Sequence, residues 1–371
     1  MKKLRAIAAW LALAAPLAHA APIVVGQVAA MTGPEASQGR AYAVGMQLAF
    51  DSVNAAGGVN GHAFTLVRKD DGGRADDTVP ATRQLLADDK PMVLAGYMGS
   101  RNVGELLQSG LLEKERIALV GYRTAEIRPD KPWVYSVRAG LRDELNKLTE
   151  HLATIGINRL GLFYEDGPGA PALIAAADEA AAKTKVKIIA RGSYAPGGAA
   201  VGPAVDQLLK QTPQAILMVS SGGAAAAFIE QYRGSGGTAQ LFAHSGADIE
   251  QMSKRLGEEQ MQGVAIAQVT PSPYKISNRL AKEFTDLVEK TPKLEVPVSY
   301  AMMEGFITAK VIVEAVRRQG ARPTREGMAT ALDGMDRVDL GGYLIGFKPG
   351  MRTGSRFVEL SIISGSGRIR Q

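Results

Sequence analysis

The chain has 371 residues, 46% of them hydrophobic and 22% charged, which predicts a folded protein of two or three domains and excludes a disordered or collagen-like chain. It contains no cysteine, which excludes disulfides, thiol catalysis and cysteine-ligated metal sites. The net charge is +6, but three basic residues lie in a segment interpreted below as a leader; without them, 40 basic side chains stand against 37 acidic ones. This near balance gives no reason to expect a nucleic-acid partner.

The first twenty residues, 1–20, are typical of a secretory signal peptide. Basic residues within 1–5 precede the ten-residue apolar run 6–15 and the small-residue pattern of 18–20. The apolar run is about half of the roughly 20 residues that cross a bilayer, which disfavours a membrane anchor. We therefore expect cleavage before Ala21 and a soluble product in the periplasm, with no direct insertion into the membrane.

From residue 22 onward, short runs of Val, Ile and Leu alternate with amphipathic helical patterns, which predicts an α/β protein with parallel sheets buried on both faces. The predicted strands are 23–28, 64–69, 92–95, 117–120, 160–164, 187–190, 215–219 and 264–267. The predicted helices between them are 40–54, 76–87, 103–113, 142–155, 170–183, 201–211 and 224–232. Two sheets with right-handed crossovers are the economical arrangement.

After residue 264 the order of elements changes. Three helical patterns follow one another and precede two strand-like runs; they cover 276–289, 298–318, 324–332, then 341–347 and 357–363. The sequence contains no fixed-period repeat and no long linker.

The motifs of several enzyme classes are missing from the sequence. There is no Gly-x-Ser-x-Gly nucleophile motif and no Walker A motif. His62, His151 and His244 are far apart and lack the spacing of zinc ligands. The acidic pairs 70–71 and 76–77 could act in acid/base chemistry, but a solvated loop and a helix N-terminus explain them better. We therefore expect no enzymatic activity, no metal and no cofactor.

Ligands of open α/β sheets bind outside the carboxyl ends of the strands, often at helix N-termini. The loops after the third and fourth predicted strands carry hydroxyls, guanidiniums and aromatic rings, which suit a carboxylate with an apolar or planar body. The candidate contacts there are Tyr97, Gly99, Ser100, Arg101, Asn102, Tyr122, Arg123 and Thr124. Helix capping by Ser100 and Asn102 and surface exposure of one arginine are the alternatives. In the second half of the chain, small polar loops at 164–169, 220–223 and 244–246 could face them.

Four segments resemble one known family. The opening run 23–34, the turn 54–61, the loop 96–102 and the late helical segment 309–315 are similar to the leucine/isoleucine/valine-binding family of periplasmic solute receptors. The similarity covers essentially the whole chain after the leader. It implies a type I periplasmic binding protein, with two Rossmann-like lobes joined by three hinge strands. Such a protein is expected to be a monomer that closes around a small molecule and delivers it to the membrane permease of an ABC importer.

The resemblance also implies a division of the chain between the lobes. Lobe 1 is expected to comprise 21–137 and 270–345, and lobe 2 is expected to comprise 138–269 and 346–371. The family's carboxylate site corresponds to Ser100, with backbone groups of Arg101 or Asn102, and to the hydroxyl of Thr124.

The second-lobe positions depart from the family's pattern. Ser245 stands where the family has an acidic residue that receives the ligand's α-ammonium, and Ser221 corresponds to a common aromatic. A buried ammonium without a counter-charge costs several kcal/mol. Two ligand classes therefore remain open: a branched-chain amino acid, with Asp248 or Asp166 as substitute partner, or an aromatic or other non-amino carboxylic acid. A ligand-sensing domain of a regulatory system is a further alternative.

Overall fold

A computed structural model describes residues 20–126, 128, 130–198, 200–364 and 369–370. A five-stranded parallel sheet forms the centre of what we call the first lobe, with strand order β2-β1-β3-β4-β5. These strands are β1 (Ile23–Ala29), β2 (Phe64–Asp70), β3 (Val93–Met98), β4 (Leu119–Arg123) and β5 (Val134–Tyr135). The helices of this lobe are α1 (Ala36–Ala55), α2 (Ala75–Asp88), α3 (Ser100–Gln108), α4 (Leu111–Glu115), α11 (Arg279–Lys290), α12 (Tyr300–Gln319) and α13 (Arg325–Asp333).

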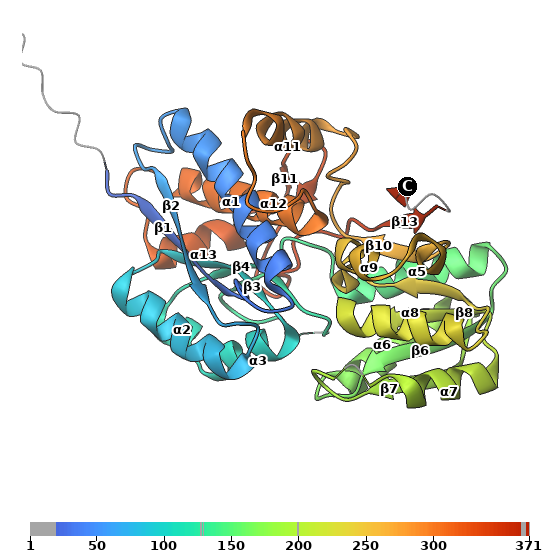
Figure 1. Cartoon of the computed structure of the whole chain (residues 1–371). Helices are drawn as coiled ribbons and strands as arrows, with labels where there is room; N and C mark the ends of the chain where they lie inside the picture. The colour runs from blue at the N-terminus through green and yellow to red at the C-terminus, as the bar shows by residue number, and fades with distance from the viewer. Residues whose placement is uncertain (1–19, 127, 129, 199, 365–368, 371) are drawn as a thin grey trace, which may run out of the picture.

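The late helix α12 packs directly on the early helix α1, as Figure 1 shows. Gly45 on α1 lies against the backbone of Met302, and Gly305 on α12 lies against the backbone of Tyr42. A side chain at either glycine would collide with backbone atoms, so only glycine permits this close approach. The chain therefore returns to the first lobe after building the second.

A seven-stranded sheet forms the centre of the second lobe, with strand order β14-β13-β10-β9-β8-β6-β7. Five strands are parallel, whereas β13 and β14 run antiparallel at one edge. The strands are β6 (Arg159–Glu165), β7 (Lys187–Tyr194), β8 (Ala215–Val219), β9 (Gln240–Ala243), β10 (Ala265–Gln268), β13 (Glu359–Ile363) and β14 (Ile369–Arg370). The helices are α5 (Leu141–Thr154), α6 (Ala170–Lys183), α7 (Gly202–Gln211), α8 (Gly222–Gly234), the 3-10 turn η1 (Ser245–Ala247), α9 (Ile249–Arg255) and α10 (Glu258–Met261).

The chain crosses between the lobes three times: after β5, after β10, and after a short antiparallel pair, β11 (Val338–Asp339) and β12 (Leu344–Ile345). Buried Tyr343 holds these crossings together, because its hydroxyl lies 2.8 Å from the carbonyl oxygen of Val137 and 3.1 Å from that of Val269. The exact lobe boundaries and the role of the crossings as hinges stay predictions.

The predicted fold class is confirmed, and nearly all the predicted strands and helices are present. Three details were wrong or missing. The helix predicted over 103–113 is two helices, because Gly110 between them adopts a left-handed conformation with φ of 66°. The strand predicted over 341–347 is reduced to the two residues of β12. The short strands β5, β9, β11 and β14, the short helices α9 and α10 and the 3-10 turn η1 were not predicted.

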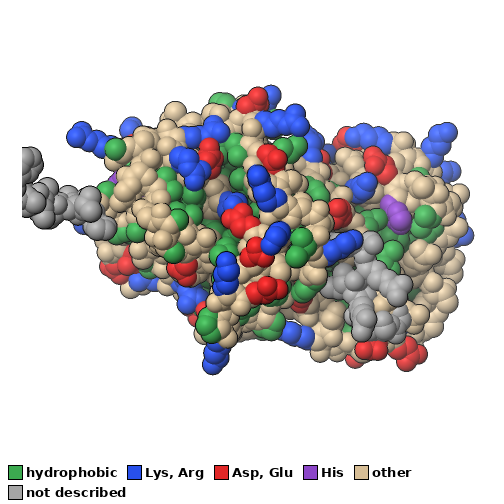
Figure 2. Space-filling view, turned by 90° about the horizontal axis from the view of Figure 1, so that it is seen from above, with side chains coloured by type: hydrophobic (Ala, Val, Ile, Leu, Met, Phe, Trp, Pro, Cys, Tyr) green, Lys and Arg blue, Asp and Glu red, His purple; other side chains and the backbone are tan. Residues whose placement is uncertain are grey.

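Residues 1–19 of the predicted signal peptide lie outside the described part of the chain. Within the described part, no helix has the length and apolar character needed to cross a membrane. Figure 2 shows basic and acidic side chains interspersed over the face seen from above. This mixture agrees with the near-balanced charge of the sequence.

Candidate functional site

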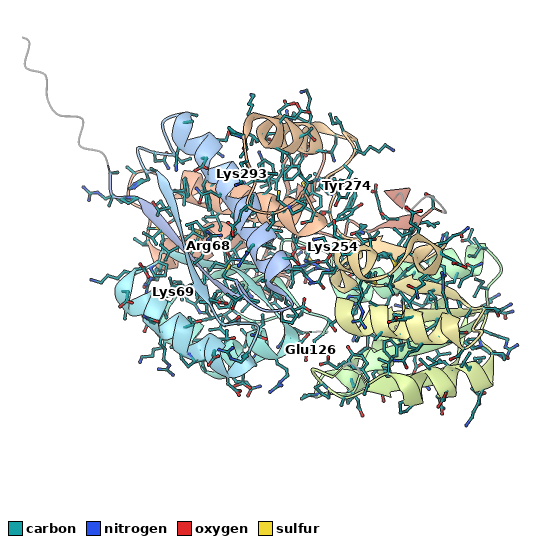
Figure 3. The ribbon with its side chains drawn as sticks, in the orientation of Figure 1. Arg68, Lys69, Glu126, Lys254, Tyr274 and Lys293 are labelled. Carbon is teal, nitrogen blue, oxygen red and sulfur yellow. The ribbon has the colours of Figure 1, made fainter. Side chains whose placement is uncertain are left out.

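The two lobes face each other through the loops that follow their parallel strands. In Figure 3, Lys254 and Tyr274 lie at the junction of the lobes, and Glu126 lies lower down between them. The first lobe contributes the start of α3 and the end of β4, and the second lobe contributes η1 and α9. This is the edge of each sheet at which ligands of α/β proteins bind.

The N-terminus of α3 is open to an anion. Gly99 precedes the helix with φ of 94° and provides no side-chain cap, so the amides of the first turn have no partner within the helix. Ser100 begins the helix, and its Oγ accepts a hydrogen bond of 3.0 Å from the amide of Ala125, in the loop after β4. Within the described part of the chain, no acceptor takes its own hydroxyl hydrogen, which can therefore donate. Thr124 stands beside this contact, with its Oγ1 3.5 Å from the carbonyl oxygen of Glu126.

Arg123, the last residue of β4, is 7% exposed and links the two lobes. Its Nη1 donates to Gln38 Oε1 at 2.6 Å, and its Nη2 donates to the backbone oxygen of Ser245 at 3.3 Å. Its Nε lies 3.3 Å from Glu304 Oε2. Hydrogen bonds from both terminal nitrogens and the ion pair with Glu304 therefore tie the guanidinium to the protein, while its Nε–H has no hydrogen-bond partner among the described residues. Contact of Arg123 with the ligand carboxylate stays a prediction.

Arg138, in the first crossing, is the second buried cation of the junction. Its Nη2 lies 3.1 Å from Glu144 Oε1 and contacts Ser245 Oγ, and its Nη1 lies 3.5 Å from Glu304 Oε2. Burial disfavours the charged form, but the carboxylates of Glu304 and Glu144 raise the pKa of Arg138 above its usual value. The guanidinium therefore stays charged and joins both lobes.

Ser245 is embedded in this network. Its amide donates to Glu144 Oε2 at 2.7 Å and its hydroxyl donates to Glu144 Oε1 at 2.9 Å. Because its carbonyl accepts from Arg123 and its hydroxyl contacts Arg138, each polar group of Ser245 has a partner within the protein. Ser245, which the resemblance aligns with the family's ammonium-binding acid, is therefore already in contact with the guanidiniums of Arg123 and Arg138.

Two predicted contacts lie in the interior of the first lobe. Tyr97 is fully buried, and its hydroxyl lies 3.0 Å from Thr82 Oγ1. Asn102 donates to Asp71 Oδ2 at 3.0 Å and to Thr78 Oγ1 at 2.9 Å. Successive side chains of β3 point to opposite faces of the sheet, and Tyr97 is on the face that packs into the core. Asn102 is on the side of α3 that faces the same core. We correct the prediction for these two side chains; the backbone amide of Asn102 still belongs to the open first turn.

The other predicted contacts lie around the junction. Arg101 is exposed, and its charge opposes the rise that burial imposes on the pKa of Glu165 in the second lobe. Ser221 caps α8 by accepting a hydrogen bond of 3.3 Å from the amide of Ala224. Arg101 and Ser221 thus approach the space between the lobes from opposite sides.

A cavity of about 280 Å³ lies between the end of β4 and the crossings. Tyr122 and Thr124 line it, together with Arg138, Glu144 and Arg352. Ser100 is not among its lining residues. Burial raises the pKa of Tyr122, so its hydroxyl stays protonated at neutral pH and can donate.

The predicted substitute acids have different surroundings. Asp248 is buried, and its Oδ1 caps α9 by accepting a 3.0 Å hydrogen bond from the amide of Gln251. Asp166 is exposed after β6. Among the residues that the structure describes, no group of three His, Asp or Glu side chains could hold a metal ion.

Sequence reasoning missed Arg138, Glu144 and Glu304. Glu144 is in the first turn of α5, where an acid is usual, and Glu304 is 166 residues from Arg138 along the chain. The one available signal was Glu304 itself, a charged residue on an otherwise apolar face of α12.

Two mostly parallel α/β sheets joined by three crossings define the fold of a type I periplasmic binding protein. The chain belongs to the family described as periplasmic binding protein, whose sequence profile matches residues 22–357. The solved structure of a substrate-binding periplasmic protein from Ralstonia solanacearum is 35% identical, with a TM-score of 0.87, and the match covers 94% of this chain and 99% of that one.

Two curated relatives match over shorter stretches. A Pseudomonas aeruginosa protein named amino acid binding protein is 35% identical over 80 residues, which are 22% of this chain and 21% of that protein. The Leu/Ile/Val-binding protein BraC3 of Rhizobium johnstonii is 39% identical over 74 residues, which are 20% of each chain. The chain thus matches about a fifth of the length of these relatives.

Proposed function

We propose that the protein is the solute-binding receptor of an ABC importer, and that it closes its two lobes around a small carboxylated solute. The observation that carries this proposal is the uncapped start of α3, where the hydroxyl of Ser100 and the first-turn amides converge beside Thr124. A helix N-terminus with unpaired amides and a nearby hydroxyl donor suits a carboxylate. The receptor acts without catalysis, in the periplasm, after removal of residues 1–20, and works as a monomer with a membrane permease.

In this proposal, the solute carboxylate accepts hydrogen bonds from Ser100 Oγ, from the amides of Arg101 and Asn102, and from Thr124 Oγ1. Tyr122 and Ser221 lie close enough to the junction to contact the rest of the solute. Closure removes water from these hydrogen bonds and strengthens them. Arg123 and Arg138 hold the lobes together.

The solute class has two candidates. The names of the two curated relatives favour an amino acid, and the name of the Rhizobium johnstonii protein favours the branched-chain class. The occupied polar groups of Ser245 favour a carboxylic acid without an ammonium group. An amino acid would have to place its ammonium near Asp248, whose carboxylate already caps α9.

Three ligands that share the leucine side chain distinguish these two solute classes. Leucine carries both charged groups, 4-methylpentanoate lacks the ammonium, and 3-methylbutylamine lacks the carboxylate. A bound solute at 100 times its dissociation constant stabilises the folded protein by about 2.7 kcal/mol, which thermal unfolding detects. The panel also includes isoleucine, valine, benzoate and phenylacetate.

The proposal expects at least one carboxylate in the panel to stabilise the protein, and 3-methylbutylamine to have no effect. Stabilisation by the amine alone would contradict carboxylate recognition, as would the absence of any shift across the panel. Binding of leucine that is lost in Asp248→Ala would assign the ammonium to Asp248. Tighter binding of 4-methylpentanoate than of leucine would select the non-amino class.

A further inference from the structure

Gln251 on α9 reaches from the second lobe to the start of α1 in the first lobe. Its Nε2 lies 3.2 Å from the carbonyl oxygen of Pro34, 3.3 Å from Ser37 Oγ and 3.5 Å from Glu35 Oε2. Its backbone amide donates to Asp248 at 3.0 Å. One residue therefore connects a carboxylate of the first lobe with a carboxylate of the second.

A third carboxyl group adjoins this contact. Glu250 Oε1 accepts hydrogen bonds from the hydroxyl of Tyr274 at 2.7 Å and from the amide of Tyr300 at 2.9 Å. Asp248 lies two residues before Glu250, and burial together with the negative charge of Asp248 raises the pKa of Glu250. The carboxyl of Glu250 therefore takes up a proton more readily than an ordinary glutamate.

The charges around these three acids do not balance them. The positive charge of Arg123, at the end of β4, lowers the pKa of Glu35, but the same guanidinium also forms an ion pair with Glu304. Burial lowers the pKa of His244, so this neighbour of Asp248 stays neutral near neutral pH. Lys254, on the same helix as Glu250, is exposed.

Tyr274 and Tyr300 complete the surroundings. Burial and the Glu250 carboxylate raise the pKa of Tyr274, so its hydroxyl remains a donor. Tyr300 offers its backbone amide to the same oxygen of Glu250. Neither residue supplies a positive charge to the three acids.

We propose that closure of the lobes takes up a proton: it brings Glu35 against the Asp248–Glu250 pair, so the closed receptor is favoured in mildly acidic solution and its solute affinity rises as the pH falls. The effect on affinity rests on the proposed function, whereas the effect on closure does not. Gln251 is the residue that joins the two sides of this contact when the lobes close.

The direction follows from the burial of the acids. Burial and Asp248 raise the pKa of Glu35 and raise that of Glu250 to about 7 from an ordinary 4.5. Glu35 meets Gln251 of the other lobe when the lobes close, so its raised pKa belongs to the closed form. Closure is therefore favoured below the ordinary glutamate pKa of 4.5, and this advantage is lost as the pH rises through the raised pKa of Glu35.

The test measures closure without any solute. The chain lacks cysteine, so Gln108→Cys on α3 and Gln207→Cys on α7, both at exposed positions, introduce two spin labels on opposite lobes. Double electron–electron resonance then gives the distribution of distances between the labels at pH 6 and at pH 8. We expect the short-distance population to increase at pH 6.

Glu35→Gln in the doubly labelled chain should remove this pH dependence, because the glutamine cannot take up a proton. Glu113→Gln, which removes an exposed acid of the same lobe on α4, is the matched control and should keep the pH dependence. Identical distance distributions at the two pH values in the parent chain would overturn the proposal. An equal pH response in Glu35→Gln and Glu113→Gln would overturn the assignment to Glu35.

A solute measurement separates this proposal from the proposed function. If a carboxylate from the panel binds, calorimetry in two buffers of different ionisation heat counts the protons taken up, and we expect uptake in the parent and none in Glu35→Gln. Binding without proton uptake would overturn the inference and leave the receptor function intact. A pH-dependent distance distribution with no carboxylate bound would support the inference and contradict the proposed solute.

Discussion

Replacement of Arg138 by methionine tests how much the buried network at the junction contributes to stability. Removing one partner of a buried ion pair typically costs 3–5 kcal/mol, because the other charge is left without compensation. Two carboxylates lose this cation, but each keeps another partner. Glu144 keeps both hydrogen bonds from Ser245, and Glu304 keeps Arg123 at 3.3 Å. We therefore expect Arg138→Met to lower the free energy of unfolding by about 3 kcal/mol, at the lower end of that range.

Urea unfolding at pH 7, followed by circular dichroism, measures this loss. The double variant Arg138→Met/Glu144→Leu is the control, since it removes a carboxylate together with its cation and should recover part of the stability. The loss in the single variant should also shrink in mildly acidic solution, because a buried carboxylate that has lost one of its cations takes up a proton more readily. A single variant within 1 kcal/mol of the parent, or a double variant less stable than the single one, would refute the reasoning.

Three further outcomes are expected. Ser100→Ala and Thr124→Ala should each weaken carboxylate binding at least tenfold, or by roughly 1.5 to 3 kcal/mol, in calorimetry; unchanged affinity in both would remove them from the site. Gly45→Ala should lower the stability by about 1 to 3 kcal/mol through its clash with α12, whereas Gly223→Ala, in open space on α8, should not; equal melting temperatures would contradict the packing argument. Amino-terminal sequencing of the exported protein should begin at Ala21, and a product that retains the apolar run would refute the leader assignment.

The fold was predictable because its strands are buried on both faces. The run 215–219 is apolar at every position and every residue of β8 is buried, so composition alone located the strand. The strand over 341–347 was overpredicted because Gly341 and Gly342 adopt positive φ values of 107° and 93°, which end regular pairing there. A sequence shows a glycine but not the sign of its φ.

The candidate site could be proposed from the sequence only by its position along the chain. The rule that ligands bind at the carboxyl ends of parallel strands led to Ser100 and Thr124, which the structure brings together at one edge of the sheet. The rule selects a loop and not the direction of each side chain. Tyr97 therefore counted as a candidate although the pleat of β3 turns it into the core, where it contacts Thr82.

The buried ion-pair network at the junction of the lobes could not be predicted from the spacing of residues along the chain. Arg123, Arg138, Glu144 and Glu304 come from a strand end, a crossing and two helices, and they meet only after both lobes have folded. Nothing in the neighbourhood of each residue along the chain distinguishes it from a surface charge.

This pairing bears on the solute more directly than the departure at Ser245 alone. A serine in place of an acid removes one partner for an ammonium group, but an aspartate nearby could have replaced it. The structure adds that two guanidiniums already occupy the acceptors around Ser245, and that Asp248 caps α9. A solute ammonium would have to displace an internal cation or compete with the amide that Asp248 caps. The competition is absent for a plain carboxylate, whose single charge needs only the donors at the start of α3.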